Sequence, residues 1–141
     1  MTQNAIFLPV LALAAVTFVV LMLIPVRRFR AAFAGTVTPA DFALGESANV
    51  PGQVSLANRN YMNLLEAPLL FYAVCIALYV TQQVDALALN IAWAYVILRG
   101  LHSLVHITYN NVVHRLSLFA LSNVALVALW VVFGMRVIEG A

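Results

Sequence analysis

Charged side chains are scarce in this chain, and lysine is absent altogether. Charged residues make up 9% of the 141 positions, all seven basic side chains are arginine, and hydrophobic residues make up 65%. A soluble domain of this length would expose far more charge, so this balance is typical of a polytopic membrane protein. The net charge of +2 is too small and too dispersed for a surface that binds nucleic acid.

Cysteine is nearly missing as well. Cys75 is the single one, which excludes an intramolecular disulfide and a cysteine-rich metal site but leaves the redox compartment open. No basic side chain precedes the first apolar run, residues 5–26, and this run is too long for the apolar region of a typical signal peptide. We therefore expect it to be a first membrane span that is retained.

Four apolar segments provide the roughly 20 residues that are needed to cross the hydrocarbon core of a bilayer. They comprise residues 5–26, 61–80, 86–108 and 116–135. Helices are expected, because lipid offers no partner for an open backbone group and the segments lack the alternation of barrel strands. The sequence thus predicts one all-α membrane domain over residues 1–141, a four-helix transmembrane bundle.

The only long polar stretch, residues 27–60, is rich in turn-forming residues and is expected to be a loop. Within it, Thr38 to Asp41 can start a short helix, and Pro25 just before it is expected to help end the first span. Arginines gather around this loop and the third connection, whereas the second connection carries an acid and no base. Because cytoplasmic loops are enriched in arginine, we expect a multi-pass membrane protein whose loop 27–60 is cytoplasmic and whose termini are not.

Polar side chains recur at helical spacing in three of the apolar segments. Three open the second segment at i, i+4 and i+7, three lie near the end of the third at i, i+3 and i+7, and one begins the fourth. They are Arg59, Asn63, Glu66, Arg99, His102, His106 and Arg115. In antiparallel helices all three groups fall in one membrane half, where ionisable residues usually face protein and serve function. The alternatives are arginines that snorkel to the headgroups and an Arg99–Glu66 pair that only supports packing.

Three arginines set against one carboxylate make an electropositive pocket, which favours a small anion. Glu66 could accept from an ammonium group and Asn63 could hold a peptide amide, so a small zwitterionic peptide with several carboxylates fits this inventory. A second, apolar substrate would arrive from the membrane lipid. His102 and His106 share a helix face and could instead bind a metal or haem, but Arg99 beside them opposes a cation, so no metal site is expected.

Three of these segments resemble a known family. Residues 59–71, RNYMNLLEAPLLF, are similar to the R-x-x-x-N-x-x-E motif of the MAPEG family (membrane-associated proteins in eicosanoid and glutathione metabolism). Residues 99–102, RGLH, resemble the R-x-x-H of its third helix, and Arg115 falls where the family has an arginine that opens the fourth helix. The resemblance covers most of the chain from Arg59 onward.

This resemblance implies a homotrimer of four-helix bundles that binds glutathione between adjacent subunits near the cytoplasmic side. The implied glutathione-binding residues are Arg59, Asn63, Glu66, Arg99, His102 and His106. Arg115 would be the catalytic residue, because a nearby guanidinium and a helix N-terminus both favour an ionised thiol. The thiolate would then attack a hydrophobic electrophile or reduce a lipid hydroperoxide.

Three positions depart from the family pattern. His106 stands where family enzymes commonly have tyrosine, Leu116 where they have serine, and Phe119 where some have another tyrosine. These departures are expected to affect catalytic turnover more than they affect the fold. A non-catalytic membrane scaffold that binds lipid or glutathione is therefore the alternative to a glutathione transferase or peroxidase, and a small haem or quinone protein is a third hypothesis.

Overall fold

The apolar segments fold into helices, and the computed structural model describes residues 2–139. The α-helices are α1 (Phe7–Phe33), α2 (Gly52–Leu65), α3 (Ala67–Val80), α4 (Ala86–Ile107) and α5 (Val112–Glu139). Two short 3₁₀ helices are η1 (Gln3–Ile6), before α1, and η2 (Pro39–Phe42), in the first loop. Because α2 and α3 together form one span, four helical rods are long and apolar enough to cross a membrane. The predicted all-α, four-span membrane fold is confirmed.

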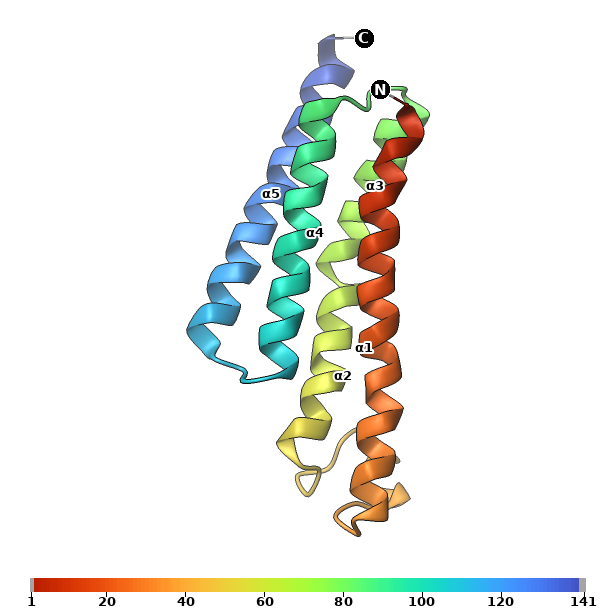
Figure 1. The fold of residues 1–141 in the computed structure, drawn as a ribbon, viewed down its shortest axis with the longest axis vertical. Helices are drawn as coiled ribbons and strands as arrows, with labels where there is room; N and C mark the ends of the chain where they lie inside the picture. The colour runs from red at the N-terminus through yellow and green to blue at the C-terminus, as the bar shows by residue number, and fades with distance from the viewer. Residues whose placement is uncertain (1, 140–141) are drawn as a thin grey trace.

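The four rods run alternately up and down (Figure 1). Helix α4 packs along α5, α1 packs along α2, and α5 also contacts α3. The first loop and the α4–α5 connection lie at one end of the bundle, whereas the start of α1 and the α3–α4 connection lie at the other. At the latter end the Gln3 side chain exchanges two hydrogen bonds with the backbone of Val84. The arginine-rich loops therefore share one end, as the short connections predict.

Helix α1 continues past its predicted end to Phe33, and Pro25 lies inside it rather than near its end. Proline removes one backbone hydrogen bond, which weakens a helix but does not always end it. The turns beyond Pro25 are held from outside: Arg27 donates to the carbonyls of Gln53 and Ile107, at 2.6 and 2.7 Å. Tertiary contacts thus extend the helix where hydropathy alone would end it.

The second span begins at Gly52, well before the predicted residue 61, and is interrupted at Glu66, whose φ of −81° and ψ of −92° are not helical. Pro68 causes the interruption, because its ring clashes with the preceding turn. Proline is tolerated in the first turn of the helix that follows, where its missing N–H has no partner to lose. The expectation that Glu66 lies on an opening turn is therefore wrong: it lies at the junction of α2 and α3.

Apolar side chains from α1, α3, α4 and α5 form the main core. In it Phe71 of α3 stacks on Tyr95 of α4, with ring centroids 4.7 Å apart. Cys75 is fully buried in the same cluster, so packing accounts for this thiol. Many large hydrophobic side chains point outward instead, among them Phe18 and Val127, as expected of helices that face lipid.

The first loop is organised around the carboxylate of Asp41. It accepts hydrogen bonds from the Ser47 hydroxyl at 2.6 Å and from the Thr38 backbone and hydroxyl at 2.8 and 2.9 Å. The predicted short helix starting near Thr38 is confirmed as η2, which Thr38 caps. The Ser47 bond, followed by the Thr38 bonds, lowers the pKa of Asp41 from 3.8 to about 2.

Asp41→Asn is expected to loosen this loop at neutral pH, because an amide accepts weaker hydrogen bonds than a carboxylate. A lowered pKa in the folded state means that the contribution of Asp41 to stability is complete above pH 3.8 and is lost as the pH falls through about 2. Amide hydrogen exchange of residues 38–50 should rise in the variant at pH 7. Wild type should show the same loss of protection, corrected for the intrinsic exchange rate at each pH, only in acid, and equal protection of the two at pH 7 would contradict the assignment.

Candidate functional site

One face of α4 buries its polar side chains inside the bundle. Arg99 is 0% exposed, and His102, Ser103 and His106 are at most 3% exposed. These residues are three, four and seven apart, which places them on one side of a helix. Among residues 2–139, several of their polar atoms have no hydrogen-bond partner: Arg99 Nε and Nη1, His102 Nε2, Ser103 Oγ, and His106 Nδ1 and Nε2. Buried polar atoms are normally paired, so this face of α4 is a candidate for ligand binding.

The break in the second span supplies a partner for Arg99. Its Nη2 donates to the carbonyl oxygen of Asn63. Asn63 lies in the last turn of α2, where carbonyl groups lack partners within the helix. The interruption at Glu66 therefore frees the group that orients this buried guanidinium. The same guanidinium lies over the ring of Phe119 of α5, with its carbon 5.3 Å from the ring centroid.

A cavity of about 240 Å³, the inner cavity, lies where α2, α4 and α5 meet. It is lined by Asn63, His102, Val112, Arg115, Leu116 and Phe119. Three sequence-predicted site residues from three helices thus share one cavity, and two of the three family departures form part of its wall. The backbone of α5 holds His102 in place, because His102 Nδ1 lies 3.0 Å from the carbonyl oxygen of Arg115. A carbonyl only accepts, so Nδ1 carries the proton.

A second cavity, of about 600 Å³, lies between the first loop, the start of α2 and the α4–α5 turn. Arg59 lines this polar cavity rather than the one that Asn63 lines. Asn110 lines it too, and its Oδ1 accepts from Arg115 Nη1 at 2.7 Å. The Asn110–Arg115 hydrogen bond therefore links the residues of the two cavities.

Glu66 stands apart from both cavities. Its side chain is exposed at the junction of α2 and α3, and it lines neither of them. Within residues 2–139 it also joins no group of three His, Cys, Asp and Glu side chains placed as metal ligands would be. In a single chain Asn63, His102 and Arg115 therefore line one cavity, Arg99 is hydrogen-bonded to Asn63 beside it, and Glu66 lines neither cavity.

Sequence reasoning missed two residues near this site. Asn60 of α2 is fully buried, and neither polar atom of its amide has a partner in the part of the chain that the structure describes. It lies three residues before Asn63, a spacing that could have placed it on the same helix face. Arg27 joins three helices by donating from α1 to Gln53 at the start of α2 and to Ile107 at the end of α4. As a charge near a helix end, Arg27 was interpreted only as a signal for membrane orientation.

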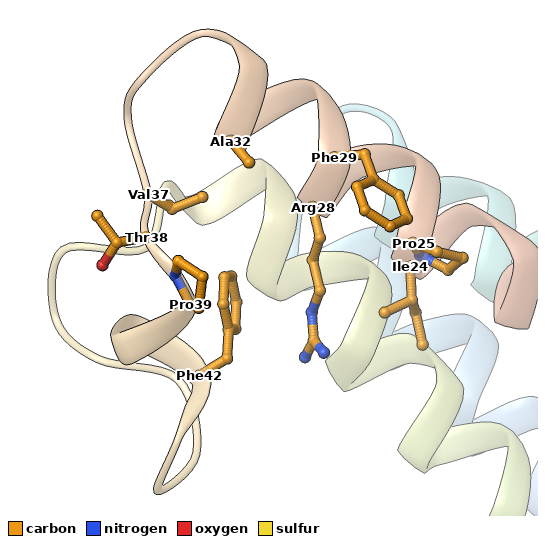
Figure 2. Close-up of a pocket in the computed structure, with 9 residues that line it drawn as sticks. All are labelled: Ile24, Pro25, Arg28, Phe29, Ala32, Val37, Thr38, Pro39 and Phe42. Carbon is orange, nitrogen blue, oxygen red and sulfur yellow. The ribbon is translucent and has the colours of Figure 1, made fainter.

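A separate apolar cavity of about 380 Å³ lies between the end of α1 and η2, and Figure 2 shows its lining. Arg28 extends through it, 4.5 Å from the centroid of the Phe42 ring and paired with Glu46 at 3.2 Å. None of the sequence-predicted site residues lines this cavity. Its single basic group is already paired, so it contributes no chemistry to the site around Arg99.

No curated protein and no solved structure matches the chain. The model of the MAPEG family, however, matches residues 6–135, which is nearly the whole length. This match includes most or all of each of the four membrane-crossing rods, and it includes the two cavities that Asn63 and Arg59 line. It agrees with the resemblance carried by residues 59–71, residues 99–102 and Arg115, and the chain accordingly belongs to the MAPEG family.

Proposed function

We propose that the protein is a glutathione-dependent membrane transferase or peroxidase that acts on hydrophobic electrophiles or lipid hydroperoxides. One observation carries the proposal: Arg99, His102 and His106 bury polar atoms for which no partner is found within residues 2–139. Leaving such atoms unsatisfied costs about 1–3 kcal/mol each, and more when the group is charged. A ligand rich in carboxylates and amides satisfies these atoms at once, and the family contains glutathione-using members.

The available groups suit glutathione part by part. Its carboxylates would accept from the free Nε and Nη1 of Arg99, and its peptide groups would pair with Asn63. The thiolate would lie at Arg115, which lines the inner cavity at the start of α5. Arg59 would reach the ligand from the polar cavity beside it.

A homotrimer would complete the site, with glutathione between adjacent subunits. The exposure of Glu66 and Arg59 on a single chain supports this, because both need a ligand or a neighbour to act as binding residues. In this arrangement residues 1–141 form one MAPEG-like domain, the arginine-rich end of the bundle faces the cytoplasm, and the termini face away from it. The charge bias supports the orientation, since only Arg136 lies near the opposite end.

The apolar substrate would approach from lipid. Leu116 and Phe119 line the inner cavity next to Arg115 and offer an apolar wall to such a molecule. The glutathione sulfur would attack the electrophilic carbon and expel its leaving group. With a lipid hydroperoxide it would attack the terminal oxygen and break the O–O bond, which releases the lipid alcohol once it is protonated and leaves a glutathione sulfenic acid. A second glutathione would then reduce the sulfenic acid, giving glutathione disulfide and water. Removing water from this space would strengthen the attraction between Arg115 and the thiolate.

Glutathione affinity binding of the detergent-purified protein tests the proposal, followed by thiolate absorbance and a screen of aryl halides and lipid hydroperoxides. Turnover of either class with a bound thiolate supports the enzyme. The lack of a hydroxyl group among the side chains that line the inner cavity favours a second candidate, a non-catalytic lipid- or glutathione-binding scaffold. Binding without a thiolate would select that scaffold, and a Soret band in the purified protein would instead select a haem protein.

Glu66→Ala is expected to weaken glutathione binding about tenfold or more, because it removes the only carboxylate proposed to meet the ligand's ammonium group. Equilibrium binding in detergent measures the effect. Glu139→Ala, at the far end of α5, is the matched control and should bind as wild type does. Unchanged affinity in Glu66→Ala would remove Glu66 from the site.

A further inference from the structure

The turn between α4 and α5 has an unusual backbone at Asn110. Its φ is +48°, in the left-handed region that glycine and asparagine tolerate best. Its backbone N–H donates to the carbonyl of Val105 at 2.8 Å, which secures the turn to the end of α4. The backbone at this position therefore restricts the residue that can occupy it.

The side chain of Asn110 holds the guanidinium of Arg115. Its Oδ1 accepts from Arg115 Nη1 at 2.7 Å. The Arg115 backbone is fixed independently, because its N–H donates to Asn111 at 3.0 Å and its carbonyl lies 3.0 Å from His102 Nδ1. No other hydrogen bond or ion pair is found for the guanidinium within residues 2–139, so Asn110 alone orients the charged end of this residue.

We propose that Asn110 is a positioning residue that directs the Arg115 guanidinium into the inner cavity and thereby sets the ionisation of the bound thiol. The inference rests on the proposed function, in which Arg115 stabilises a glutathione thiolate. Three demands meet at this position: a left-handed backbone, a hydrogen-bond acceptor, and no charge. Glycine meets the first and third demands and aspartate meets the first two, whereas asparagine meets all three.

The neutrality of the acceptor is the decisive demand. An amide oxygen fixes the guanidinium and leaves its positive charge available to the thiolate. A carboxylate at the same place would fix it equally well, but its negative charge would offset that of Arg115 and repel the thiolate. The same geometry thus gives opposite electrostatic outcomes with asparagine and with aspartate.

The experiment titrates the thiolate absorbance of glutathione bound to wild type, Asn110→Gly and Asn110→Asp. Asn110→Gly keeps the backbone and frees the guanidinium, so the pKa of the bound thiol should rise by about half a unit to one unit. Asn110→Asp should raise it further, by more than about one unit, which lowers the thiolate at a fixed neutral pH about tenfold. Gln82→Gly is the matched control, because Gln82 also has a positive φ, 59°, but lies in the α3–α4 connection at the other end of the bundle.

The order of the three pKa values separates positioning from simple support of the turn. If the hydrogen bond only stabilised the turn, aspartate would replace asparagine and give the wild-type pKa, which overturns the proposal. Identical pKa values in all variants overturn it too. Failure of wild type to form any thiolate would refute the proposed function itself. Should Asn110→Gly not assemble, Asn110→Asp alone decides, because it keeps both the hydrogen bond and the backbone preference.

Discussion

Arg115→Ala is expected to abolish the glutathione thiolate while leaving much of the glutathione binding intact. Arg115 is the basic residue that lines the inner cavity, and the thiolate needs a nearby positive charge to form at neutral pH. Without it the pKa of the bound thiol should return to the ordinary value of about 8.5, so the thiolate at pH 7 falls about tenfold or more. Binding persists because Arg99, Asn63 and Glu66 are proposed to hold other parts of the ligand.

Thiolate absorbance and equilibrium binding, measured on the same preparation, check this expectation. Arg115→Lys should recover part of the thiolate, since it keeps the charge but loses the planar group that Asn110 holds. Arg136→Ala, which removes an arginine paired with Asp85 at the opposite end, should leave the thiolate unchanged. An Arg115→Ala variant that ionises the bound thiol normally would show that another group stabilises it.

Arg99→Met is expected to destroy glutathione binding without destabilising the fold. Truncating one member of a buried charge pair costs about 2–5 kcal/mol, so affinity should fall from about 30-fold to more than 1,000-fold. Stability should hold, because replacing a buried charge by an apolar side chain of similar length is often neutral or stabilising. The substitution loses the hydrogen bond to the Asn63 carbonyl, but it also removes Nε and Nη1, two buried donors for which no partner is found within residues 2–139.

Paired measurements of affinity and of thermal unfolding in detergent distinguish a binding role from a packing role. Arg30→Met, which changes an exposed arginine on α1, is the matched control and should alter neither quantity. If Arg99 only supported packing, Arg99→Met would unfold at a lower temperature and still bind glutathione at near wild-type affinity. That result would remove the main support for a ligand bound beside Arg99.

The number of spans and their order could be predicted from hydropathy, because lipid requires long apolar helices and short connections force neighbouring helices to be antiparallel. Helix ends could not, since they depend on contacts distant in sequence. Arg27 extends α1 beyond Pro25 by bonding to Gln53 and Ile107, and no local pattern around Arg27 reveals these partners. The break at Glu66 lies between the two cases: Pro68 is a local cause of it, but the early start of α2 did not follow from the apolar run.

The α4 half of the site followed from helical spacing, because polar residues on one face of a membrane helix must turn inward. Arg59 and Glu66 did not follow, since their surroundings depend on the α2–α3 junction and, as proposed, on a neighbouring subunit. Asn60 and Asn110 escaped notice for another reason. The spacing of Asn60 from Asn63 places the two on one helix face, but the full burial of Asn60 becomes evident only in the structure. Asn110 is defined by a hydrogen bond to Arg115 and a positive φ, which neither composition nor spacing displays.

The junction at Glu66 also bears on how the chain enters the bilayer during synthesis. Helix α3 has 14 residues, about 21 Å at about 1.5 Å per residue, whereas the hydrocarbon layer is about 30 Å thick. The last turns of α2 must therefore supply the missing length and carry Asn63 into the apolar layer. Until Arg99 of α4 has been translated, the backbone carbonyl of Asn63 lacks the hydrogen bond that Arg99 donates to it. We expect the second hydrophobic segment to leave the translocon only when the third has arrived, so that the two partition into lipid as a pair.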